Sequence, residues 1–125
     1  MVDLMRQVHG HLDERCAALD LTRQQALLLA ILDEPLPMGV IAERLGCDAS
    51  NITGIADRLE ARGLVERRGA ASDRRVRLLA RTGAGTSLER ALREDIWSAS
   101  PLIAGLTTGQ QEQLRDLLRL ALHNT

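Results

Sequence analysis

The sequence predicts a mainly α-helical fold with one small β-hairpin. Over most of the 125 residues, apolar side chains recur at intervals of three and four, the period of an amphipathic helix. The period changes to two only between residues 64 and 80, where a hairpin is expected. The chain contains neither Phe nor Tyr, and Trp97 is its one aromatic residue. A core of Leu, Ile, Val and Ala suits packed helices.

The N-terminal third is expected to hold two helices. Thr22 and Gln25 form a capping box that begins the second helix. The apolar run over residues 26–32 places this helix at the centre of the core, and Pro35 and Pro37 end it before a very short strand. The first helix, over residues 1–19, is predicted from a single apolar stripe: Met1, Met5, Val8, Leu12, Cys16 and Leu19.

Residues 39–46 and 49–61 are predicted to be two short helices joined by a tight turn. Gly46 and Gly63 end them, and Asp48 or Ser50 is placed to cap the second helix. Two short helices at this spacing are typical of a helix-turn-helix. The polar face of the second helix carries the side chains that we expect to contact DNA: Ser50, Asn51, Thr53 and Arg58.

A β-hairpin is expected next, with strands over residues 64–68 and 74–80. A long helix then runs from residue 82 to about residue 98. Thr107 begins a last helix with an apolar face of Leu114, Leu117, Leu118 and Ala121. The basic hairpin supplies the remaining candidate DNA contacts, which are Arg68, Asp73, Arg74, Arg75 and Arg77.

The net charge of −1 conceals an uneven distribution. Residues 1–49 carry four Arg against eight acidic residues, whereas residues 50–81 carry eight Arg against four, a net charge of +4. A basic block inside a mildly acidic chain is the footprint expected of a nucleic-acid contact face. The alternative is a solvated face with salt bridges, in which Arg62 and Arg67 pair with Glu60 and Glu66 and contact no DNA.

Several functional classes are disfavoured by what the sequence lacks. No apolar run approaches the roughly 20 residues of a membrane span, and the N-terminus lacks a signal-peptide pattern, so a cytoplasmic protein with no membrane partner is expected. Two cysteines and three scattered histidines give no metal-ligand spacing, so we expect neither metal nor cofactor. No catalytic triad or phosphate loop appears, and the chain is not expected to be an enzyme. The Arg-only, Leu- and Ala-rich composition favours a high-GC bacterial genome.

A helix-turn-helix followed at once by a hairpin is a winged helix, in which the helix enters the major groove and the hairpin reaches the flanking DNA. Over residues 10–122, the chain resembles the MarR family of multiple-antibiotic-resistance-type transcriptional regulators. The resemblance rests on an ordered set of segments: Leu21-Thr22, Ile41-Ala42-Glu43-Arg44-Leu45, Ser50-Asn51-Ile52-Thr53, residues 57–67, Asp73-Arg74-Arg75, Thr82 and Gly85.

The resemblance implies a homodimer in which residues 1–20 and 82–125 form dimerisation helices. Residues 21–81 would be the DNA-binding lobe within a single domain of residues 1–125. It also implies a repressor that binds a pseudo-palindromic duplex and is released by a small molecule or an oxidant. The resemblance further implies that Arg75 enters the minor groove and that Asp73 braces it.

Three alternatives stay open at this level. Cys16 lies on the apolar stripe, which favours core packing over a thiol-based redox sensor. Trp97 is either a packing residue or an anchor for an aromatic ligand. A winged helix that serves only as a protein-interaction module is the second functional hypothesis, and salt-dependent DNA binding separates it from the first.

Overall fold

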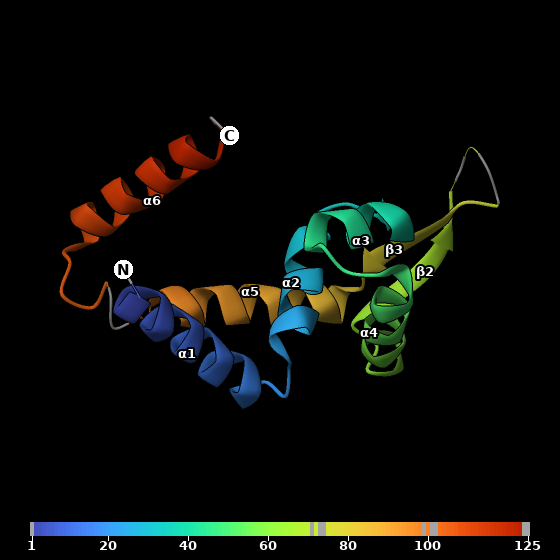
Figure 1. Ribbon diagram of the computed structural model, residues 1–125, viewed down its shortest axis with the longest axis horizontal. Helices are drawn as coiled ribbons and strands as arrows, with labels where there is room; N and C mark the ends of the chain where they lie inside the picture. Colours follow the sequence, from blue (N-terminus) through green and yellow to red (C-terminus); the bar gives the residue numbers. More distant parts are fainter. Residues whose placement is uncertain (1, 71, 73–74, 99, 101–102, 124–125) are drawn as a thin grey trace.

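The computed structural model describes residues 2–70, 72, 75–98, 100 and 103–123, and it confirms the predicted mainly helical class with a small antiparallel sheet (Figure 1). Asp73 and Arg74 therefore lie outside the described residues. The helices are α1 (Val2–Ala18), α2 (Arg23–Ile31), α3 (Met38–Leu45), α4 (Ala49–Ala61), α5 (Gly83–Ser98) and α6 (Thr108–His123). The strands are β1 (Leu36–Pro37), β2 (Val65–Gly69) and β3 (Arg77–Arg81).

The sheet has the order β1-β3-β2, and both pairings are antiparallel. The predicted hairpin is confirmed as β2 and β3, with Val65 opposite Arg81 and Gly69 opposite Arg77. The second strand begins at Arg77, so the expected start at residue 74 was wrong. The backbone N–H of Ala70 donates to the Val76 carbonyl at 3.0 Å, and this bond closes the turn ahead of the strand. We call residues 65–81 the wing.

Helix α2 lies at the centre of the core, as its apolar run predicts. Leu28 and Leu29 are completely buried, and they belong to one apolar cluster with Ile41 of α3, Ile52 of α4 and Leu79 of β3. The capping box is confirmed, because the Gln25 N–H donates to Thr22 Oγ1 at 3.1 Å and the Thr22 N–H donates to Gln25 Oε1 at 3.0 Å. The capping box thus sets the start of α2. The buried side chains of α2 then hold the surrounding helices in place.

The turns on either side of α4 use left-handed glycines. Gly46 (φ 62°) ends α3, and Gly63 (φ 73°) follows α4. Few residues other than glycine adopt this backbone conformation without strain. Of the two residues expected to cap α4, Asp48 holds the N-cap position without a side-chain capping hydrogen bond, and Ser50 lies inside the first turn, since the helix begins at Ala49.

The winged-helix lobe is joined to α5 by close backbone contacts. Thr82 Oγ1 donates to the Gly63 carbonyl at 2.6 Å and accepts from the Gly85 N–H at 3.1 Å. The backbone N–H of Thr82 donates to the Leu64 carbonyl at 3.1 Å. The first turn of α5 therefore lies directly against the turn between α4 and β2.

The terminal helices leave apolar surface uncovered. In Figure 1, α1 lies beside α5, whereas α6 lies away from the other helices. The residues of α6 include no buried side chain. The exposed large apolar side chains of these two helices are Val2, Leu4, Met5 and Val8 of α1 and Leu117, Leu118, Leu120 and Leu122 of α6. Within the described residues, no helix is long and apolar enough to cross a membrane.

Candidate nucleic-acid interface

Helix α4 presents two chemically different faces. Ile52, Ile55, Ala56 and Leu59 are buried, which follows from their spacing of three and four residues. The opposite face is exposed, and all four residues predicted for DNA contact lie on it, namely Ser50, Asn51, Thr53 and Arg58. The helix is therefore fixed from behind by its apolar face and offers hydroxyl, amide and guanidinium groups to the outside.

Thr53 makes a local hydrogen bond within α4. Its Oγ1 donates to the Ala49 carbonyl at 3.0 Å, which occupies the hydroxyl proton. The oxygen can still accept a hydrogen bond, and the methyl group can contact the methyl group of a thymine. Asn51 keeps both a donor and an acceptor, the combination that reads adenine in the major groove.

The wing brings further arginines to the surface. Arg75 lies exposed in the turn, and Arg77 is exposed at the start of β3. Arg68 is also exposed, and its Nε donates to Glu66 Oε1 at 2.7 Å. Glu66 therefore neutralises part of the charge that the sequence assigns to this strand.

Arg67 is held by α4 and is not directed outward. Its two terminal nitrogens donate to Asp57 Oδ1 and Glu60 Oε1, each at 2.6 Å. The hydrogen bond to Asp57, which is the main cause, raises the pKa of the Arg67 guanidinium. The pairing with Glu60 confirms part of the salt-bridge alternative, and it ties β2 to α4.

Arg62 likewise contacts the chain's own backbone. It donates to the carbonyls of Asp20 at 2.6 Å and Leu19 at 3.2 Å, where α1 meets α2. Asp20 has a positive φ of 57°. Arg62 therefore anchors the end of α4 to the α1–α2 junction, and it makes no pair with Glu60 or Glu66 among the contacts that the structure gives it.

Arg81 is the residue whose position the sequence indicated least. Charge alone allowed it to contact DNA, but its side chain is only 11% exposed and pairs with Glu89 of α5 at 3.1 Å. The weak signal was its place in the strand pattern, directly after the apolar residues Leu79 and Ala80. Glu89 was missed because helix α5 offers several acidic residues and the sequence does not show which one is buried.

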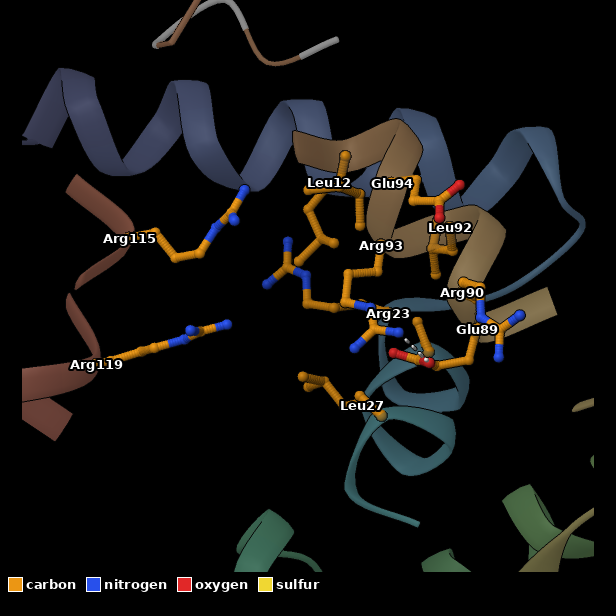
Figure 2. Close-up of a pocket in the computed structure, with 13 residues that line it drawn as sticks. Leu12, Arg23, Leu27, Glu89, Arg90, Leu92, Arg93, Glu94, Arg115 and Arg119 are labelled. Atoms are coloured by element: carbon orange, nitrogen blue, oxygen red, sulfur yellow. Dashed lines mark ion pairs between the residues drawn. The ribbon is translucent and has the colours of Figure 1, made fainter. Parts of the chain in front are cut away.

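A pocket of about 640 Å³ opens among α1, α2, α5 and α6 (Figure 2). Its apolar wall includes Leu12, Leu27 and Leu92, and its polar wall carries five arginines against two glutamates. Figure 2 shows Arg115 and Arg119 extending from α6 toward this space. We call it the inter-helix pocket; its remaining lining residues are Arg23, Ala26, Ala30, Glu89, Arg90, Arg93, Glu94 and Ile96.

The arginines of the pocket differ in how they are held. Arg23 donates to both oxygens of Asp13, at 2.9 and 2.7 Å, so it is a fixed part of the wall. That hydrogen bond lowers the pKa of the Asp13 carboxyl. Arg93 is 66% exposed and only reaches Glu89 at 3.6 Å. A solvent-exposed cation beside an apolar wall suits the anionic end of an amphipathic molecule.

Cys16, Cys47 and His11 make contacts within the fold. Cys16 is 1% exposed, and its burial is the main cause that raises the pKa of its thiol. Cys47 contributes its Sγ–H to the Leu45 carbonyl at 3.4 Å. His11 Nε2 lies 2.9 Å from the Ile96 carbonyl. Over the described part of the chain, no three His, Cys, Asp or Glu side chains gather as a metal site.

Comparison with known proteins shows that the winged-helix region is similar to one protein family. Residues 19–76 match the MarR family. The uncharacterized HTH-type transcriptional regulator YfiV of Bacillus subtilis (strain 168) is 41% identical over 59 residues. That alignment spans 46% of this chain and 37% of YfiV, so the similarity covers well under half of the relative's length.

Two crystal structures extend the similarity across the chain. A MarR-family transcriptional regulator from Rhodococcus sp. RHA1 is 26% identical with a TM-score of 0.76, covering 99% of this chain and 90% of its own. CouR from Rhodococcus jostii RHA1, bound to p-coumaroyl-CoA, is 28% identical with a TM-score of 0.73, covering 94% and 85%. The similarity of fold therefore also covers the helices that flank the winged helix.

Proposed function

We propose that the protein is a transcriptional regulator that binds double-stranded DNA sequence-specifically, because residues 19–76 match the MarR family. One observation carries the proposal. The four polar residues of α4 lie together on its exposed face, while its apolar residues are buried behind them. An α-helix fits the major groove, and these side chain types make hydrogen bonds to base edges.

Arginine contacts supply the affinity in this proposal, and α4 supplies the selectivity. Arg75 and Arg77 of the wing lie on its exposed surface, where they meet the phosphates or the minor groove beside the base contacts of α4. Arg68 adds to this positive surface, although its pairing with Glu66 reduces its share. Arg67 is excluded from it, because both of its terminal nitrogens are engaged by α4.

The uncovered apolar faces of α1 and α6 support a homodimer. Exposed leucines on α6 are costly in water, and a second copy of the same chain offers a matching apolar surface. In the dimer, residues 1–20 and 82–125 form the interface, and residues 21–81 form the DNA-binding lobe. Two copies of α4 related by a twofold axis read a pseudo-palindrome whose half-sites lie roughly 34 Å apart.

The inter-helix pocket is the proposed effector site. Its arginine-rich, apolar lining selects a small anionic molecule with an apolar body, and CouR, a structure with the same fold, is bound to p-coumaroyl-CoA. The pocket lies between the uncovered helices and the winged helix. A ligand that binds best when the two DNA-binding lobes of the dimer are spread apart lowers the affinity for DNA. By linkage, DNA lowers the affinity for the ligand by the same factor. The protein would then be a ligand-released repressor.

Selection from a pool of random duplexes tests the DNA-binding proposal. The full chain is incubated at about 150 mM salt, near physiological ionic strength, and the retained duplexes are sequenced. We expect an inverted repeat with half-sites about 10 bp apart. If no sequence is enriched and DNA binding is lost at this salt concentration, the DNA-binding proposal is wrong, and the protein-interaction function takes its place.

Sedimentation equilibrium tests the dimer separately. We expect the wild type to sediment as a dimer and the α6 variant Leu118→Glu to sediment as a monomer, since it places a charge within the apolar face. Gln113→Glu adds the same charge at an exposed polar position of α6 and is the control. A wild type that stays monomeric at high micromolar concentration would contradict the proposed interface.

A further inference from the structure

Arg81 joins three parts of the fold at the root of the wing. It is the last residue of β3, and its side chain is nearly buried. One terminal nitrogen donates to the Leu29 carbonyl of α2 at 3.1 Å and pairs with Glu89 Oε2 of α5 at 3.1 Å. The other lies 3.3 Å from Asp33 Oδ1, between α2 and β1. Its Nε is buried and has no hydrogen-bond partner among the described residues.

Glu89 is the buried counterion of this guanidinium. Its side chain is 10% exposed, whereas Asp33, the other acidic partner of Arg81, is 86% exposed. A buried charge that loses its counterion is strongly destabilised, whereas an exposed pair contributes little. Glu89 is therefore the main counterion of Arg81. Arg93, the second cation paired with Glu89, lies 3.6 Å from its carboxylate and is 66% exposed (Figure 2).

The strand that Arg81 ends is the one that carries the wing. β3 is the central strand of the sheet, paired with β1 on one side and β2 on the other. Arg77 lies at its far end, roughly 13 Å away at about 3.3 Å per residue. A change in how Arg81 is held thus acts on the same strand that leads to the exposed arginines.

We propose that the buried Arg81–Glu89 ion pair positions the wing on α5, with Glu89 as a positioning residue for DNA contact by Arg75 and Arg77. The consequence for DNA rests on the proposed function. The positioning itself does not, because it concerns contacts within the chain. Glu89 also lines the inter-helix pocket, so the carboxylate that fixes the wing root faces the proposed effector site.

Hydrogen–deuterium exchange of the full chain tests the positioning without DNA. Glu89→Gln removes the counterion and keeps the shape of the side chain. Asp95→Asn removes a carboxylate from the same helix that pairs instead with Arg15 at 3.6 Å, and it is the matched control. We expect exchange in peptides from the wing to be about tenfold faster in Glu89→Gln only, with peptides from α4 unchanged. Equal wing exchange in the two variants would overturn the proposal.

A second variant covers the case in which Glu89→Gln unfolds. Replacing both partners, Arg81→Met with Glu89→Met, removes the buried charge as well as the pair, so this double variant is expected to fold even if the single variant does not. The wing is still expected to exchange faster than in the wild type. Wild-type exchange of the wing in this double variant would also overturn the proposal.

The salt dependence of DNA binding is a second measurement, and a simple loss of stability would not change it. On the duplex enriched by the wild type, we expect Glu89→Gln to bind about tenfold more weakly and with a smaller salt slope, because fewer arginines reach phosphates. Faster wing exchange with unchanged affinity and slope would overturn the role of Glu89 in DNA contact. If the wild type enriches no duplex, the DNA-binding function fails, and the exchange data still decide whether the pair positions the wing.

Discussion

Gly85 lies so close to Leu64 that a Cβ atom at Gly85 would stand 1.9 Å from the Leu64 carbonyl oxygen. The neighbouring hydrogen bonds of Thr82 hold the two segments at this distance. The absence of a side chain at Gly85 is therefore what allows α5 to begin directly against the turn that follows α4.

Gly85→Ala is expected to destabilise the protein by about 3 kcal/mol, since the neighbour is backbone and cannot rotate away. Gly83→Ala is the control in the same first turn, because no atom lies within 4 Å of a Cβ built there. It should be neutral or stabilising by up to about 1 kcal/mol. Urea unfolding of both variants measures the difference, and equal midpoints would contradict the contact.

Arg58 and Arg67 are predicted to differ in function although they are nine residues apart in the basic block. Arg58→Ala should change which duplexes are enriched, because its side chain lies on the exposed face of α4. Arg67→Ala should leave the enriched sequence unchanged and cost about 1 kcal/mol or less, as its pairs with Asp57 and Glu60 are partly exposed. Duplex selection with both variants measures this. A shifted preference in Arg67→Ala alone would reverse the assignment.

Arg75→Ala is predicted to weaken DNA binding about tenfold and to flatten its salt dependence by about one unit per half-site. The reason is the loss of a cation on the exposed turn of the wing. Fluorescence anisotropy over a salt series measures both effects. Arg6→Ala removes the same charge from exposed α1 and controls for net charge. An unchanged slope in Arg75→Ala would remove the wing from the DNA interface.

Cys16 is predicted to be inert in the folded protein. Its burial raises the pKa of the thiol above the ordinary value of 9.0, so the reactive thiolate is disfavoured. Because the folded state holds the proton more tightly than the unfolded state, the contribution of Cys16 to stability is lost as the pH rises above 9. Iodoacetamide at pH 7.5 should modify Cys47 and reach Cys16 only after unfolding. Modification of Cys16 in the native protein would support the thiol-sensor alternative.

The sequence was most informative where structure is decided locally. The capping box at Thr22 and Gln25 and the glycines at the ends of α3 and α4 act within a few residues, and the predicted bounds of α4 agree with the structure. The polar face of α4 follows in the same way from its period. These features need no knowledge of the rest of the fold.

What the sequence did not show depends on contacts between distant segments. Eight arginines in residues 50–81 look alike by charge, but Arg62 meets the end of α1, Arg67 meets α4, and Arg81 meets α5. Each of these contacts joins residues that come together only after the helices have packed. The inter-helix pocket is a product of the same packing, and its arginines come from three different helices.

Glu89 lines the inter-helix pocket and also pairs with Arg81 at the root of the wing. The pocket therefore has one side that is tied to the wing through Glu89 and another side that is not. Leu12 of α1 and Leu27 of α2 line the pocket, and we expect substitutions there to admit a differently shaped molecule while the wing stays in place. Under the proposed function, we expect substitutions next to Glu89 to change both the ligand preference and the affinity for DNA. New chemical signals are therefore expected to be acquired through the α1 and α2 side, and redesign of this protein as a biosensor should begin there.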